Sequence, residues 1–231
     1  MRVAAGTSGF AYKEWKGAFY PEDLPSARML RYYADHFPTV EINHTFYRLP
    51  RAQMLAGWTQ EVPAGFSFAL KAPRRITHVQ RLAGAEDALQ AFERAAEALG
   101  PMRGPTLYQL PPFLRKDLPR LREFLGLLSP DGRAAFEFRH ASWFDDEVYE
   151  LLRKHRSALC VAEADDFATP FVETASYGYL RLRRHDYNPD GLRAWAERLQ
   201  AAAWSEVWVF FKHDDAGTAP RFATELAKLV S

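Results

Sequence analysis

The stretch AFEFR at residues 135–139 alternates large apolar side chains with charged ones. Phe136 and Phe138 fall on one face of a strand, and Glu137 and Arg139 fall on the other, because successive side chains of a strand point to opposite faces. In a parallel barrel the outer face of each strand packs on helices, and the inner face turns polar only near the rim, where water or a ligand is available. The stretch therefore predicts a barrel strand that ends at a functional rim.

Seven further strand-like runs accompany this one. They are VAAG at 3–6, TVEIN at 39–43, FSFALK at 66–71, TLYQL at 106–110, ALCVAE at 158–163, YGYLRLR at 177–183 and VWVFFK at 207–212. Amphipathic helical patterns lie at 26–37, 85–99, 118–128, 146–155, 190–203 and 219–230, with a weaker one at 51–62. Because no strand resembles an edge and no GxGxxG turn occurs, a closed barrel is favoured over an open doubly wound sheet. We predict one (β/α)₈ TIM-barrel-like domain over residues 1–231.

The balance of charges limits the classes of partner. Thirty Lys and Arg residues against 29 Asp and Glu residues give a formal charge of +1, which argues against a polyanion-binding surface over the whole protein but permits a local basic site. The single cysteine, Cys160, excludes an intramolecular disulfide. No apolar run approaches the roughly 20 residues that cross a bilayer. We therefore expect a cytoplasmic protein without a membrane partner.

Polar residues of the same parity end most of the predicted strands. They are Glu41, Asn43, Lys71, Gln109, Glu137, Arg139, Glu163, Asp165, Arg181, Arg183, Lys212 and Asp214. Isolated buried charges are costly, so this many ionisable residues at one end of a barrel needs a reason. One explanation is an active site. The other is a structural ion-pair network that plugs the barrel mouth, in which Glu137 pairs with Arg139 or Glu41 with Arg181.

The cationic members of this set predict an anionic ligand, because arginine forks bind phosphate and carboxylate groups in a bidentate way. They are Lys71, Arg139, Arg181, Arg183 and Lys212. Glu41 and Glu137 are candidates for general base and general acid, since a carboxyl near cations and another in an apolar wall can have well-separated pKa values. Asn43 is expected to orient the substrate, and Gln109 to bind it.

Lys71 has two interpretations. Neighbouring arginines can depress the pKa of its amine, which would allow a Schiff base of the aldolase kind. Alternatively, Lys71 forms an ion pair with Glu41.

Aromatic residues follow several strands, on the side where substrates enter a barrel. They are Phe10, Tyr12, Trp15, Phe46, Tyr47, Trp143 and Tyr187. Such rings either stack on a sugar or base, which contributes roughly 1–3 kcal/mol per base, or pack as lids and helix caps. We expect Tyr47 and Trp143 to bind substrate. Two weaker features are a solvated basic loop with Arg74, Arg75, His78 and Arg81, and the turn GTSG at 6–9, whose N–H groups could hold an anion.

Candidate metal ligands are scattered along the chain. They are His44, His78, His140, His185 and His213, with the carboxylates Glu41, Glu137, Glu163, Asp165 and Asp214. No HxH or HExxH spacing occurs, so no multi-zinc site and no cofactor is predicted, and a single Mg²⁺ or Mn²⁺ stays an alternative.

Long motifs run through almost the whole chain. They are GTSGFAYKEWKGAFYP at 6–21, YYADHFPTVEINHTFYRLP at 32–50, FALKAPRRITH at 68–78, LYQLPP at 107–112, FEFRHASWF at 136–144, YLRLRRHDY at 179–187 and FFKHDDAG at 210–217. Through these motifs the chain resembles the YecE-like family, also called domain of unknown function 72. The resemblance implies a TIM-barrel-like fold and no settled activity. The commoner family pattern reads RLHG and YFNN on the last two strands. RLRRH and FFKHD stand there in this chain, so the resemblance implies a more cationic rim through Arg183 and Lys212.

Barrels of similar outline include endonuclease-IV-like and xylose-isomerase-like metal enzymes, an analogy at the level of fold. We hypothesise a hydrolase, lyase or isomerase that acts on a phosphorylated or acidic sugar, or on a nucleotide fragment, by acid–base chemistry at the barrel mouth. The alternative is a non-catalytic protein that binds nucleic acid or an anionic metabolite in the same pocket.

Overall fold

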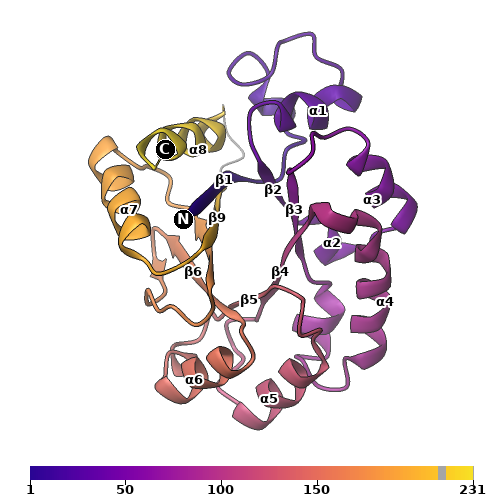
Figure 1. Cartoon of the computed structure of the whole chain (residues 1–231), viewed down its shortest axis with the longest axis vertical. Coiled ribbons are helices and arrows are strands. Elements are labelled where there is room, and N and C mark those ends of the chain that lie inside the picture. The colour runs from indigo at the N-terminus through magenta and orange to yellow at the C-terminus, as the bar shows by residue number, and fades with distance from the viewer. Residues whose placement is uncertain (213–216, 231) are drawn as a thin grey trace.

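Eight parallel strands form a closed barrel. The structure, a computed structural model, describes residues 1–212 and 217–230. The strands follow each other around the ring as β1 (Arg2–Ser8), β2 (Thr39–Ile42), β3 (Ser67–Lys71), β4 (Arg103–Gln109), β5 (Ala134–Glu137), β6 (Ala158–Ala164), β8 (Tyr177–Leu182) and β9 (Glu206–Phe211). Pairing of β5 with β6 and of β9 with β1 closes the ring (Figure 1). The predicted fold class is confirmed.

Helices surround the barrel (Figure 1). They are α1 (Met29–Ala34), α2 (His44–Tyr47), α3 (Ala52–Thr59), α4 (Glu86–Ala96), α5 (Leu118–Leu127), α6 (Asp146–Lys154), α7 (Pro189–Ala201) and α8 (Thr218–Leu229). Side-chain caps fix where three of them begin. Asp117 accepts a hydrogen bond from the Arg120 N–H at 3.1 Å, Asp145 accepts one from the Glu147 N–H at 3.0 Å, and Asn188 accepts one from the Gly191 N–H at 2.8 Å.

The alternation of strand and helix is interrupted after β6. A short strand, β7 (Phe167–Ala168), turns back antiparallel to β6, and no helix follows before β8. Threonine side chains hold this return segment against β6: Thr169 Oγ1 accepts from the Ala162 N–H at 2.9 Å, and Thr174 Oγ1 accepts from the Leu159 N–H at 2.7 Å. The segment thus covers β6 in place of a helix.

Inward and outward residues of the strands separate as their parity predicts. Val40, Ile42 and Phe136 belong to the large core between strands and helices. The inside of the barrel holds a second cluster, composed of Ala4, Ala69, Leu107, Ala135, Ala158, Cys160, Ala162, Tyr177, Tyr179, Trp208 and Phe210. On β3, β5 and β8 the polar residues come two positions after a member of this cluster, so apolar side chains fill the barrel beneath its polar end.

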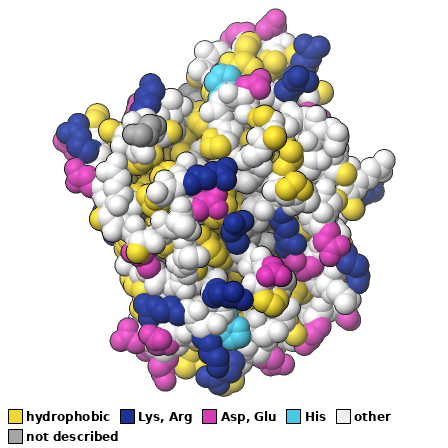
Figure 2. Space-filling view, viewed as in Figure 1, with side chains coloured by type: hydrophobic (Ala, Val, Ile, Leu, Met, Phe, Trp, Pro, Cys, Tyr) yellow, Lys and Arg dark blue, Asp and Glu magenta, His cyan; other side chains and the backbone are white. Residues whose placement is uncertain are grey.

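Basic and acidic side chains are interspersed over the face that Figure 2 shows, as the formal charge of +1 suggests. Within the described ranges, none of the helices is long and apolar enough to span a membrane.

Gly6 permits close packing of β1 on β2, and its replacement gives a test of the fold. A Cβ atom there would lie 2.2 Å from the Thr39 carbonyl oxygen and 3.0 Å from the Tyr33 hydroxyl. Gly6→Ala should lower the free energy of unfolding in urea by about 1–3 kcal/mol, because backbone must move to admit the methyl group. The control is Gly126→Ala in α5, where nothing lies within 4 Å of the new Cβ, and a gain of up to about 1 kcal/mol is expected. Equal stability of the two variants would contradict the described β1–β2 packing.

Candidate functional site

Two buried glutamates joined by one arginine form the centre of the polar end of the barrel. Glu41 in β2 and Glu137 in β5 are fully buried, and Arg181 in β8 is 2% exposed. Arg181 Nη2 donates to Glu41 Oε1 at 2.9 Å, and Nη1 donates to Glu137 Oε2 at 2.6 Å. These charge-assisted hydrogen bonds are of the stronger kind. One guanidinium therefore connects three strands that are not neighbours in the sheet.

Glu41 has further donors around it. Ser8 Oγ donates to Oε1 at 2.6 Å, Tyr179 Oη donates to Oε2 at 2.7 Å, and Asn43 Nδ2 donates to Oε1 at 3.1 Å. Burial raises the pKa of this carboxyl, but Arg181 and the hydrogen bonds outweigh burial, so the pKa lies below its ordinary value of 4.5. Glu41 is therefore ionised at neutral pH.

Glu137 forms ion pairs with three arginines. Besides Arg181, it accepts from Arg183 Nη2 at 3.2 Å, forms an ion pair with Arg139 Nη2, and accepts from Gln109 Nε2 at 3.0 Å. Burial raises the pKa of the Glu137 carboxyl, and Arg181 and then Arg183 more than reverse this effect, so the pKa is lowered. Arg181 is thus a shared cause of the lowered pKa of both carboxyls.

Glu41, Glu137 and the cations around them form a cluster, here called the cationic cluster, that holds more positive than negative charge. Lys71, Arg139, Arg181 and Arg183 face two carboxylates, which leaves a surplus of two positive charges when Lys71 is protonated. The Nε atoms of the three arginines are buried and, among the described residues, have no hydrogen-bond partner. Arg139 and Arg183 are 19% and 17% exposed, so a ligand at the rim can reach them.

Lys71 ends β3 and has no counter-ion among the described residues. Its Nζ lies 4.1 Å from the centroid of the Phe46 ring, and no ion pair or hydrogen bond joins its amine to another described residue. Burial, followed by the charge of Arg181, lowers the pKa of Lys71 to about 8. The alternative in which Lys71 forms an ion pair with Glu41 is therefore not what the structure shows.

Asn43, Gln109 and Lys212 were also predicted to bind the ligand. Asn43 and Gln109 lie in the cluster, where both donate to carboxylates. The half-buried Lys212 follows β9, and its N–H donates to the Leu182 carbonyl oxygen at 3.2 Å, next to Arg183.

Tyr47 and Trp143 lie elsewhere. The Tyr47 side chain is 79% exposed on the outer rim. Trp143 is fully buried, its ring is stacked on Phe138 with centroids 4.6 Å apart, and its Nε1 donates to the Leu114 carbonyl oxygen at 2.7 Å. The prediction that Trp143 binds substrate is thus corrected: the ring packs on the outward face of its strand and belongs to the core.

The candidate metal ligands do not converge. Within residues 1–212 and 217–230, no three His, Cys, Asp or Glu side chains come together as a metal-binding group. His185 Nδ1 contacts the Asp165 carboxylate at hydrogen-bonding distance, and Glu163 accepts from Trp195 Nε1 at 3.1 Å. His213 and Asp214 lie outside the described residues.

Ser8 and Tyr179 belong to the site but were not predicted. Parity gives a signal for Tyr179, because it lies two residues before Arg181 and so on the same inward face. No signal in the sequence points to the contact between Ser8 and Glu41. The GTSG turn is not an open anion cradle, because the Thr7 N–H donates to the Tyr33 hydroxyl and the Gly9 N–H donates to the Glu41 carbonyl oxygen.

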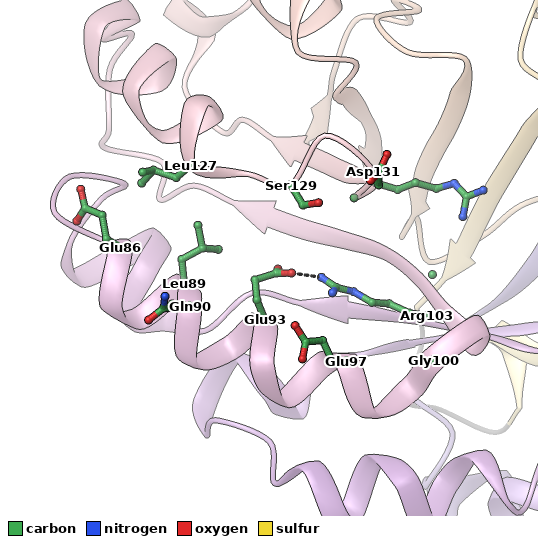
Figure 3. A pocket seen from close by; sticks show the side chains of 13 residues that line it. Glu86, Leu89, Gln90, Glu93, Glu97, Gly100, Arg103, Leu127, Ser129 and Asp131 are labelled. Atoms are coloured by element: carbon green, nitrogen blue, oxygen red, sulfur yellow. Dashed lines mark hydrogen bonds and ion pairs between the residues drawn. The ribbon is translucent and has the colours of Figure 1, made fainter.

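A pocket lies at the amino-terminal end of β4, away from the charged cluster. It has a volume of about 670 Å³ and is lined by α4, the start of β4 and the loop before β5 (Figure 3). Glu93 in this pocket pairs with Arg103 at 2.6 Å, while Glu86, Glu97 and Asp131 add negative charge. Its position and charge separate it from the cationic cluster.

Comparisons with known proteins agree with the barrel. A family model described as "Protein of unknown function DUF72" matches residues 4–231. The chain belongs to the DUF72 family. The UPF0759 protein YecE of Escherichia coli K12 is 34% identical over 229 residues, an alignment that covers 85% of this DUF72 chain and 84% of YecE. The UPF0759 protein YunF of Bacillus subtilis 168 is 29% identical over 141 residues, which cover 58% of this chain and 50% of YunF.

Solved DUF72 structures share the fold. A DUF72 protein (TM1631) from Thermotoga maritima MSB8 superposes with a TM-score of 0.84 at 27% identity and covers 100% of this chain and 99% of its own. A second one (EF0366) from Enterococcus faecalis V583 gives a TM-score of 0.82 at 19% identity over 99% and 95% of the two chains, which is evidence for fold alone. The resemblance inferred from the motifs is confirmed, and the family's description assigns no reaction.

The two ion pairs of Arg181, with Glu41 and Glu137, form a bridge between strands. This bridge predicts a large, pH-dependent loss of stability in Arg181→Met. Removing the arginine leaves two buried carboxylates without their shared counter-charge, so the free energy of unfolding at pH 7 should fall by about 3–5 kcal/mol. The folded-state pKa of each carboxyl is below its ordinary value of 4.5. The bridge of the wild type therefore contributes its full stabilisation of the folded state above pH 4.5, and this stabilisation is lost as pH falls through the folded-state pKa values. The difference between wild type and variant should therefore shrink in acid.

Urea unfolding monitored by circular dichroism between pH 4 and pH 7 measures this difference. The matched control is Arg193→Met, which removes an exposed pair with Asp190 at 3.6 Å and should cost less than about 1 kcal/mol at any pH. A loss in Arg181→Met no greater than in the control would show that the bridge does not hold these strands.

Proposed function

We propose that this DUF72 protein is an enzyme that acts on an anionic small molecule at the carboxyl ends of its barrel strands. The proposal rests on one observation: Lys71, Arg139, Arg181 and Arg183 surround two carboxylates, which leaves positive charge in surplus. A phosphorylated or acidic sugar, or a nucleotide fragment, is the substrate class that this charge fits. A cytoplasmic location stays a prediction from the sequence.

The structure suggests a division of labour within the cluster. Arg139 and Arg183 are partly exposed and would bind the anionic group, with Lys212 beside them. Glu41 and Glu137 are fully buried and hydrogen-bonded, so they suit a positioning role better than the acid and base roles expected from the sequence. Lys71 is the group that would transfer protons, because an amine with a pKa of about 8 takes up and releases a proton near neutral pH.

Anion binding can be tested without knowing the substrate. Phosphate, sulfate, sugar phosphates and nucleoside monophosphates, each compared with chloride at equal ionic strength, should raise Tm by about 3–6 °C when one of them is present at about ten times its Kd. Arg183→Gln should reduce this shift, because it removes a reachable cation. The exposed Arg193→Gln should keep the shift. No shift with any anion would refute the proposal.

A second function, binding of single-stranded nucleic acid, is favoured by a groove on the outer rim. The groove has a volume of about 750 Å³ and lies between α2, α4 and η3 (Arg75–Val79), a π-helical turn that follows β3. Its lining residues are Phe46, Tyr47, Arg48, Leu49, Pro73, Arg74, Arg75, Val79, Asp87, Ala88 and Ala91. Tyr47 is exposed for stacking on a base, and no ion pair with a described residue occupies Arg48, Arg74 or Arg75.

This groove adjoins the cationic cluster through Phe46, whose ring contacts Lys71 on one side and Tyr47 on the other. A strand bound in the groove could thus place one nucleotide near the rim arginines. Tyr47→Ala should weaken binding of a fluorescein-labelled polythymidine by roughly five-fold or more, because it removes a stacking contact of about 1–3 kcal/mol. Fluorescence anisotropy at low salt measures the affinity, with the exposed Phe113→Ala as a control outside the groove. Equal affinities of the two variants and wild type would exclude this groove as the binding surface.

A further inference from the structure

We propose that Lys71 is a nucleophilic amine that forms a Schiff base with an aldehyde or ketone carrying a carboxylate or phosphate group. This inference rests on the proposed function, because the rim arginines must hold the anionic group. The reacting atom of the protein is Lys71 Nζ, and the reacting atom of the substrate is its carbonyl carbon.

The position of Lys71 suits an attack on a bound carbonyl compound. The residue ends β3 on the inward face, paired through the sheet with Leu107 of β4. Its amine lies over the Phe46 ring and is not tied to either carboxylate by an ion pair. The ring can also stabilise a protonated imine, which is a cation like the ammonium it replaces. Lys71 is thus held in place by a contact that survives the reaction.

The charged groups around Lys71 favour its neutral form. Burial, then Arg181 of β8, and to a smaller extent Arg183 just after β8 lower the pKa of the amine, and together they outweigh Glu41 and Glu137, which raise it. His78, from η3, is a further titratable neighbour, and burial followed by the charge of Lys71 lowers its own pKa. With a pKa of about 8, the neutral fraction of Lys71 at pH 7 is roughly 100-fold or more above that of an ordinary lysine. Only the neutral amine attacks a carbonyl group.

The reaction balances without any other reagent. The lone pair of Nζ forms a bond to the carbonyl carbon, the carbon–oxygen double bond becomes a single bond, and proton transfer from nitrogen to oxygen gives a carbinolamine. Uptake of one proton by the hydroxyl group and loss of water then leave a protonated imine. Arg139 and Arg183 would hold the carboxylate or phosphate while these steps proceed. The substrate class is therefore a 2-oxo acid or a phosphorylated aldehyde or ketone.

Borohydride trapping tests this assignment on the full chain. The protein is incubated at pH 7 with pyruvate, glyoxylate or glyceraldehyde 3-phosphate, each with sodium borohydride, and modified lysines are located by peptide mass mapping. At least one compound should give a reduced adduct on Lys71, at a yield roughly ten-fold or more above that on the exposed Lys154 and Lys228. The oxo acids and the phosphate compound distinguish the two anionic groups. Yield on Lys71 should level off above about pH 8, whereas yield on Lys154 should keep rising.

Site mapping in the wild type keeps the test independent of whether a variant folds. Lys71→Arg, which keeps the positive charge, serves as a second control and should give no adduct at position 71 and unchanged adducts on the exposed lysines. Adducts spread evenly over all lysines, or none on Lys71, would overturn the proposal. If anions raise Tm while Lys71 stays unmodified, the Schiff base is wrong and the anion site stands. If neither occurs, the proposed function fails as well.

Discussion

The bridge from Glu41 through Arg181 to Glu137 is the constraint on which the polar end of this barrel depends. Each of the three side chains is buried, and none could be ionised there alone, because an isolated charge in such a place costs several kcal/mol. Together they satisfy one another across β2, β5 and β8, at 2.9 Å and 2.6 Å. Of the two explanations that the sequence left open, the structural ion-pair network describes these three residues well.

The bridge does not account for the rest of the cluster. Arg139 and Arg183 both contact Glu137, which already pairs with Arg181, and Lys71 forms no ion pair with a carboxylate of the described residues. A purely structural plug needs no surplus cations, since each adds a desolvation cost without a matching attraction. The buried bridge and the cationic rim above it therefore fit a rigid support that holds reachable cations in position, which is the arrangement expected of a site built on strands rather than on loops.

The same arrangement changes the chemistry that the site can perform. Two ionised, fully hydrogen-bonded carboxylates have little capacity to give or take a proton, although they can hold neighbouring groups. The one group in the cluster with a pKa moved toward neutrality is the amine of Lys71. Its environment comes from residues of β3, β8 and α2, far apart in sequence, so its lowered pKa is a property of the closed barrel.

Period-two alternation in the strands determined the fold class and most of the site. It places Glu41, Glu137, Arg139 and Arg181 on inward faces because side-chain direction in a strand is local geometry, fixed by each residue and its neighbours. The pairs Glu41–Arg181 and Glu137–Arg139 were named from the sequence as one alternative, and tertiary structure decided the other contacts. Arg181 reaches both glutamates, Lys71 reaches none, Ser8 joins Glu41, and the Trp143 ring packs against Phe138 in the core. Pairing and pKa depend on distances between strands that only barrel closure sets, and the Trp143 ring follows a loop whose path no alternation specifies.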